Sequence, residues 1–191
     1  MRKFSLWSIV LVIVIIAGLW LVAAYNGLVT SKGSVENAWA QVETQYQRRV
    51  DLVPNLVSTV KGAANFEQET FRAVTEARSA WAQAKTVGDR GQQIQAASSF
   101  DGALGRLLVT VEAYPQLQAT QAFRDLMTQL EGTENRIAVA RKDFNDSVFS
   151  YNVRVRRFPG MIAAKLFGYL PEQSFEASPG SDTAPAVDFT E

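Results

Sequence analysis

The amino-terminal part of the chain contains one long apolar run. Residues 6–24 read LWSIVLVIVIIAGLWLVAA, and no charged residue occurs from Phe4 to Ser31. At a helical rise of about 1.5 Å per residue this run is about 29 Å long, which matches a bilayer core of about 30 Å. We therefore predict a single-pass transmembrane helix over residues 6–24, with the lipid bilayer as its partner and the cell (inner) membrane as its location.

Two properties of this segment stay open. Residues 22–24 (VAA) resemble a cleavage site and Arg2 and Lys3 precede the run, so a cleaved signal peptide is the alternative. The run is, however, longer than the usual signal-peptide stretch of about 7–15 residues. Arg2 and Lys3 also outnumber Lys32 close to the other end, which by the positive-inside rule favours a cytoplasmic amino terminus.

Beyond the span, apolar residues recur at alternating spacings of three and four, as in an amphipathic helix. The first series crosses Pro54 without a change of phase, and only Glu67 and Arg78 are polar at positions of its stripe. Because proline removes a backbone hydrogen-bond donor, we expect one long helix with a kink at Pro54, and a break there is the alternative. The apolar members of the series are Val35, Trp39, Val42, Tyr46, Val50, Val53, Val57, Val60, Ala64, Phe71, Val74 and Trp81.

Two further helices follow a glycine-containing loop at residues 86–91 (TVGDRG). The second helix is expected to end near Tyr114, before Pro115, and the third to run from a Thr120 cap to the stop signal FPG at residues 158–160. The predicted fold class is all-α: an N-terminal transmembrane helix followed by an elongated antiparallel helical bundle. The bundle has three long helices, the first kinked at its proline, or four if the chain breaks there.

We divide the chain into a membrane anchor with a short tail (residues 1–31), a helical bundle (32–175) and a disordered acidic tail (176–191). The expected helices differ in length, because a first helix of about 50 residues spans about 75 Å and the second only about 33 Å. Part of the bundle then lacks a partner, unless the apolar segment 161–170 or another subunit covers it.

The residue types that are absent narrow the possible chemistry. The chain has no cysteine and no histidine, which excludes disulfides, thiolate or histidine metal sites, and catalysis that depends on histidine. Several glutamates remain, but helical di-metal sites normally recruit histidine as well, so we expect no metal. The net charge is zero and no glycine-rich phosphate loop occurs. We therefore expect no nucleic acid, no cofactor and no enzymatic activity.

Eight separate sequence blocks carry a resemblance to a known family. They are YNGLV (25–29), VENAWAQV (35–42), RRVDLVPNLVSTVKG (48–62), VTEAR (74–78), EAYPQL (112–117), TENRIAVARKDFN (133–145), YN (151–152) and RFPGMIAAKLFGY (157–169). In this order they resemble the LemA family, from the end of the span to about Phe175. The resemblance implies a bacterial membrane protein with one span, a helical bundle and no established enzymatic activity. It also implies a cytoplasmic bundle, opposite to the charge count, so the side of the membrane stays open.

The first candidate interaction site is the proline itself with its neighbours Asp51 and Asn55. A kink at Pro54 frees a backbone carbonyl, which Asn55 or a partner can bind, and Asp51 can accept hydrogen bonds from freed amides. The alternative is a structural bend without a partner.

Charged residues on the apolar stripe form the second candidate site. Glu67 and Arg78 are expected to pair with Arg141 and Glu134 of the third helix, because buried charges without partners are costly. Such a network either fixes the register of the helices or lines a ligand pocket.

The last candidates lie toward the end of the third helix. Tyr151 and Asn152, like Asn145, are expected to supply hydrogen bonds between helices. Arg154, Arg156 and Arg157 precede the apolar segment and form a candidate membrane-surface site, the alternative being an ordinary solvated helix end. These features favour a membrane-anchored interaction or scaffold protein, with a homo-oligomer as one way to cover the unpaired length of its helices. The alternative is an accessory or regulatory subunit of a membrane enzyme such as a protease.

Overall fold

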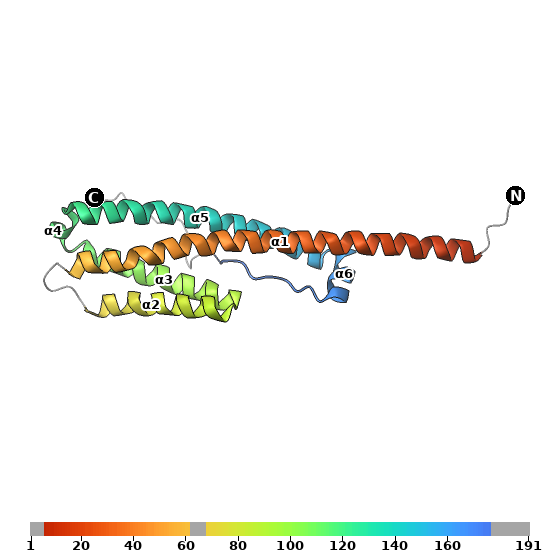
Figure 1. Cartoon of the computed structure of the whole chain (residues 1–191), viewed down its shortest axis with the longest axis horizontal. Coiled ribbons are helices and arrows are strands. Elements are labelled where there is room, and N and C mark those ends of the chain that lie inside the picture. The colour runs from red at the N-terminus through yellow and green to blue at the C-terminus, as the bar shows by residue number, and fades with distance from the viewer. Residues whose placement is uncertain (1–5, 62–67, 177–191) are drawn as a thin grey trace, which may run out of the picture.

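The structure is a computed structural model that describes residues 6–61 and 68–176, and all regular structure within them is helical. The elements are α1 (Leu6–Lys61), α2 (Gln68–Val87), α3 (Arg90–Val111), α4 (Pro115–Gln118), α5 (Gln121–Arg156) and α6 (Gly160–Phe167). Figure 1 shows an elongated molecule in which α1 lies along α5, and α2 and α3 pair beside the end of α1 that is remote from the amino terminus. The predicted all-α class is confirmed for the described residues.

Helix α1 runs without interruption from the apolar run into the bundle. The apolar run is long enough to cross a membrane, and none of its most hydrophobic stretch is buried inside the protein. This part of α1 projects beyond every other helix (Figure 1). From Leu28 onward α1 buries one face against the bundle. A single helix therefore joins a lipid-compatible segment to a protein core.

The helix does not end where the apolar period predicts. α1 continues through Pro54 to Lys61, and α2 begins at Gln68, so the expected continuous helix as far as Trp81 is wrong. Helix α1 is not interrupted at Pro54 either, and its axis bends only gently in the half that contains this residue (Figure 1). Glycine, which commonly ends helices, follows Lys61 in the sequence. The unbroken apolar period concealed this signal.

The local signals around the later helices agree with the structure. The Asp89 carboxylate accepts the Gln92 amide at 2.7 Å and caps α3, directly after Gly88, whose φ of 76° favours glycine. Thr120 caps α5 as predicted, by accepting the Phe123 amide at 3.4 Å. Helix α3 ends at Val111, slightly before the predicted Tyr114.

The difference in helix length is resolved by the end of the chain. After α6, residues 168–176 run back along the bundle in an extended course toward α2 and α3 (Figure 1); we call this segment the strap. The Phe175 ring stacks on Trp39 of α1 with ring centroids 6.0 Å apart, and Trp39 also packs edge-on against Phe144 of α5 at 5.1 Å. The strap thus covers the part of the α1–α5 pair that α2 and α3 do not reach. Apart from Glu176, the predicted disordered tail lies outside the described residues.

Pro54 gives a direct test of the strain in α1. Its side chain is exposed, so the Pro54→Ala variant changes little packing and restores an amide that donates to the Val50 carbonyl. We expect the free energy of unfolding to rise by about 1–3 kcal/mol, measured by chemical denaturation of the full chain in detergent. The exposed Ser58→Ala is the control for helix propensity alone and should give less than about 0.7 kcal/mol. An unchanged or lower stability of the Pro54 variant would contradict this account, and loss of a binding partner at unchanged stability would favour an interaction site.

Candidate functional site

Polar side chains from α1, α3 and α5 meet inside the bundle around Asp101. The Asp101 carboxylate accepts hydrogen bonds from the Tyr46 hydroxyl at 2.7 Å, from Arg49 Nη1 at 2.7 Å and from Arg141 Nη2 at 2.6 Å. Arg141 also donates to the Tyr46 hydroxyl, and Arg49 forms an ion pair with Glu134. We call these residues the Asp101 network.

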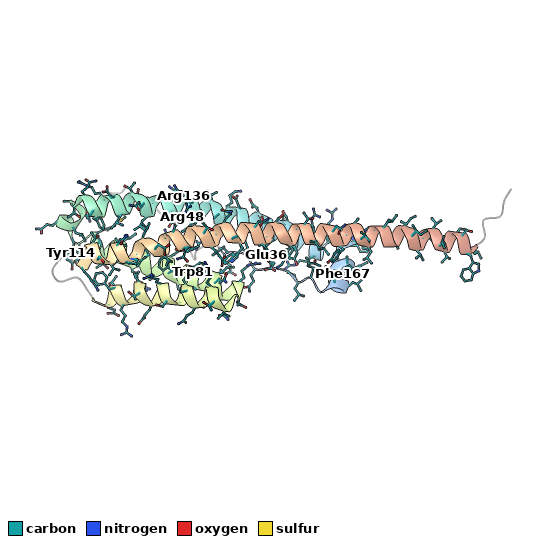
Figure 2. All side chains as sticks on the ribbon, in the orientation of Figure 1. Glu36, Arg48, Trp81, Tyr114, Arg136 and Phe167 are labelled. Carbon is teal, nitrogen blue, oxygen red and sulfur yellow. The ribbon has the colours of Figure 1, made fainter. Side chains whose placement is uncertain are left out.

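The electrostatics of the Asp101 network favour a structural role over a catalytic one. Burial, together with the Asp101 carboxylate, raises the pKa of Tyr46 far above its ordinary value, so its hydroxyl stays protonated and donates. The Tyr46 ring lies 5.1 Å from that of Trp81, which sits between α1 and α2 (Figure 2). Arg49 is only 5% exposed, and a guanidinium at such a depth requires partners. The network therefore ties three helices into one register.

The structure corrects the partners that the sequence suggested for this network. Arg141 and Glu134 do take part, but they pair with Asp101 and Arg49. Arg78 is exposed on α2 and forms no ion pair with the described residues, because Ala77 occupies the buried position. Glu67 lies outside the described residues.

Arg49 and Asp101 were not predicted, although the sequence holds a signal for the first. A strict alternation of four and three from Val35 onward passes through position 49, and the side chains at 35, 39, 42, 46, 49, 53, 56 and 60 are all buried. An arginine in this series predicts a buried charge that needs a carboxylate from another helix. Asp101 has no such signal, since it follows Phe100 on the border of the apolar face of α3.

The strap is held by two asparagines of α5. Asn152 donates to the Glu172 carbonyl and accepts the Glu172 amide, both at 2.8 Å. About two helical turns earlier on α5, Asn145 makes the same pair of bonds with the backbone of Phe175, at 3.1 and 2.9 Å. The buried Tyr151 donates to the Leu170 carbonyl at 2.8 Å. These residues were expected to join helices, and they instead bind an extended segment through its backbone.

The strap also carries a charge that links it to two helices. Arg90, at the start of α3, lies 2.6 Å from Glu172 and 2.6 Å from Glu36 of α1, and Lys32 pairs with both carboxylates. Although burial alone acts in the opposite direction, hydrogen bonds from Arg90 and Lys32 lower the pKa of Glu36 below its ordinary value. Burial alone would lower the pKa of Lys32, but its own hydrogen bonds to Glu172 and Glu36 outweigh burial and raise it. The charged forms of Glu36 and Lys32 are therefore favoured. The ion pairs of Glu172 with Lys32 and Arg90 hold the strap at its middle.

The candidate site at Pro54 looks different from the expected one. Asp51, Pro54 and Asn55 are all exposed on α1. Asp51 accepts a hydrogen bond from Gln47 Nε2 at 2.9 Å, on its own helix, rather than from backbone amides at a kink. Asn55 contributes its carbonyl to the Thr59 hydroxyl at 2.9 Å.

The arginines at the end of α5 lie where α1 leaves the bundle. Arg154, Arg156 and Arg157 are exposed, and Arg154 Nη1 is 3.5 Å from the Gly27 carbonyl. Arg154, Arg157 and Phe158 line a cavity of about 290 Å³ against Ala23 and Gly27 of α1. The candidate membrane-surface residues are thus next to the end of the apolar run, which their positions in the sequence do not show.

The model of the LemA family matches residues 38–189 of the chain. The chain belongs to the LemA family. Family membership, together with the amino-terminal apolar helix, supports a membrane-associated protein whose molecular role is not established.

Relatives of this LemA family member include magnetosome proteins. MamQ 2 of Paramagnetospirillum magneticum is 29% identical, over 85% of this chain and 68% of the relative. MamQ of Magnetospirillum gryphiswaldense has the same identity and the same coverage, 85% and 68%. Protein LemA of Metamycoplasma hominis is 25% identical, over 74% of this chain and 64% of its own length.

The Asp101 network predicts an unequal effect of two charge removals. In Asp101→Ala two guanidiniums lose their shared carboxylate, so we expect the free energy of unfolding to fall by about 3 kcal/mol. The matched control is Glu134→Ala, whose side chain is 59% exposed and whose loss should cost at most about 1 kcal/mol. Thermal and chemical unfolding followed by circular dichroism measures both. Equal effects of the two substitutions would contradict the central position of Asp101.

The asparagine clamps predict the behaviour of the strap. Replacing Asn145 and Asn152 together by alanine removes four hydrogen bonds to its backbone. We expect amide hydrogen exchange of residues 170–176 to accelerate at least about tenfold, while exchange in α1 stays unchanged. The exposed Asn135→Ala on the same helix is the control. If the double variant protects the strap as well as the unaltered chain does, side-chain packing of Phe175 holds it instead.

Proposed function

We propose that this LemA family member is a single-pass inner-membrane protein that acts as an interaction scaffold. Its scaffold is an elongated bundle of antiparallel helices, and this bundle associates with the bundle of a second copy of the chain. The observation that carries the proposal is the continuity of α1. Because one helix forms both the apolar run and a side of the bundle, the distance of each bundle residue from the apolar run is fixed. Two copies in the same membrane then present the same residues at the same level.

The interaction face we assign lies on α5. Val139, Phe149 and Val153 share one side of this helix, and Phe149 is 71% exposed, which is unusual for a phenylalanine outside the membrane. Beside Phe149, a groove of about 470 Å³ is lined by Val148, Val153 and the strap residue Ser174. In two copies at equal height Phe149 meets Phe149, so an apolar contact forms without any change in the bundle.

The absence of cysteine makes this contact testable by cross-linking. In membranes, the Val153→Cys variant of the full chain, which keeps Phe149, should form a covalent dimer with a short bismaleimide. The matched control is Val109→Cys, a residue of α3 that is 66% exposed and lies away from this face. Equal cross-linking of the two variants, or none at Val153, would contradict the dimer.

Purification in mild detergent separates the scaffold from the other function considered for this sequence. A homogeneous homo-oligomer that the Phe149→Ser substitution disrupts supports the proposal. Stoichiometric copurification of a membrane enzyme such as a protease, with a monomeric chain, would replace it by the role of an accessory or regulatory subunit.

A further inference from the structure

Helix α6 is apolar on the side that faces away from the bundle. It buries only Ala163 and Ala164 against the core. Its large side chains, and those at its two ends, point outward and are between 43% and 75% exposed: Phe158, Ile162, Leu166, Phe167 and Leu170. A helix in contact with water normally has the reverse arrangement, so this one lacks its natural environment in the isolated chain.

The position of α6 identifies the missing environment. Phe167 packs against Tyr25 of α1 with ring centroids 4.8 Å apart, and Tyr169 lies 6.4 Å from the same ring. Tyr25 immediately follows the apolar run, whose last residue is Ala24. Figure 2 shows Phe167 beside α1 at the point where α1 leaves the bundle. When the run spans a bilayer, α6 is therefore at the depth of the lipid headgroups.

Basic residues surround this apolar surface. Arg154, Arg156, Arg157 and Lys165 are exposed, and none of them forms an ion pair with the described residues. The acidic Glu172 on the nearby strap already pairs with Lys32 and Arg90. Four uncompensated cations beside an apolar helix are the pattern of a surface that binds anionic lipid.

We propose that α6 and the adjoining end of α5 lie in the headgroup region of an anionic bilayer and form a second membrane contact beside the span. We call this surface the lipid patch; it consists of Arg154, Arg156, Arg157, Phe158, Ile162, Lys165, Leu166, Phe167 and Leu170. The inference rests on the membrane anchor of the proposed function. A single span leaves the bundle free to tilt and to rotate about α1, whereas a second contact to one side of α1 fixes both. The α5 face with Phe149 then has a defined orientation relative to neighbouring copies.

The test places one label at each of three depths in the full chain. Leu166→Cys carries a fluorophore on the lipid patch, Val22→Cys on the span and Val109→Cys at the remote end of the bundle, all of them exposed in the structure. The proteins are reconstituted into nanodiscs of phosphatidylcholine with phosphatidylglycerol. Quenching is measured with nitroxide-labelled lipid and, separately, with aqueous iodide.

We expect nitroxide lipid to quench the labels at Val22 and Leu166, and iodide to quench the label at Val109. Helices of this kind lie about 5–10 Å into the boundary between headgroups and acyl chains. If the Leu166 label responds to iodide as the Val109 label does, the lipid patch is in water and the inference is wrong. If both quenchers fail at Leu166, protein covers the patch, and the inference is also wrong.

Two further readouts complete the test. Replacing Arg156 and Arg157 by glutamine should lower the equilibrium constant for binding of the lipid patch to the bilayer about fivefold for each charge in anionic nanodiscs. In pure phosphatidylcholine the same replacement should leave this constant unchanged. An equal effect in both lipids would contradict the role of charge. The Val22 label separates the two levels of the proposal: without nitroxide quenching there, the span itself is not inserted and the proposed function fails. Quenching at Val22 without quenching at Leu166 overturns the lipid patch alone.

Discussion

The structure depends on a helix that does not stop at the end of the apolar run. The last turns of the apolar run already belong to the bundle, because Trp20, Leu21 and Ala24 pack against the buried core. Below them the same helix is apolar on all sides, and above them it is apolar on one side only. A flexible linker would allow the bundle to move independently of its anchor. A continuous helix instead transmits the position of the span to every residue of the bundle.

A long helix needs partners along its whole length, and the chain supplies different ones at different heights. Far from the membrane, α2 and α3 cover α1 and α5, and the Asp101 network fixes their register. Closer to the membrane no helix is available for this purpose among the described residues, so the strap fills the groove. It is held by backbone hydrogen bonds to Asn145 and Asn152 and by ion pairs of Glu172. Next to the apolar run α6 packs through two alanines and its large apolar side chains stay exposed, and in our proposal these side chains contact lipid.

The sequence predicts the helices and the apolar run well, because both depend on patterns within a short stretch of chain. The Thr120 cap and the loop near Gly88 are local in the same sense. The predicted end of α1 is wrong, since the apolar period continues into α2 although helix α1 ends at Lys61. Arg78 was assigned to the buried stripe in place of Ala77, an error of one position that reverses a side chain from core to solvent. The partners of Glu134 and Arg141 depend on how distant helices align, which a single sequence does not encode locally. The asparagine clamps could not be predicted because their partners are backbone groups of an extended segment.

The central claim is that α1 is one rigid helix from the lipid to the bundle. The most direct measurement is the distance between spin labels on the full chain in nanodiscs, attached to cysteines that replace Val12 and Asn37, both exposed on α1. At a rise of about 1.5 Å per residue, an unbroken helix predicts a narrow distribution centred near about 38 Å. A broad distribution, or a maximum well below this value, would show a hinge between span and bundle and would contradict the account.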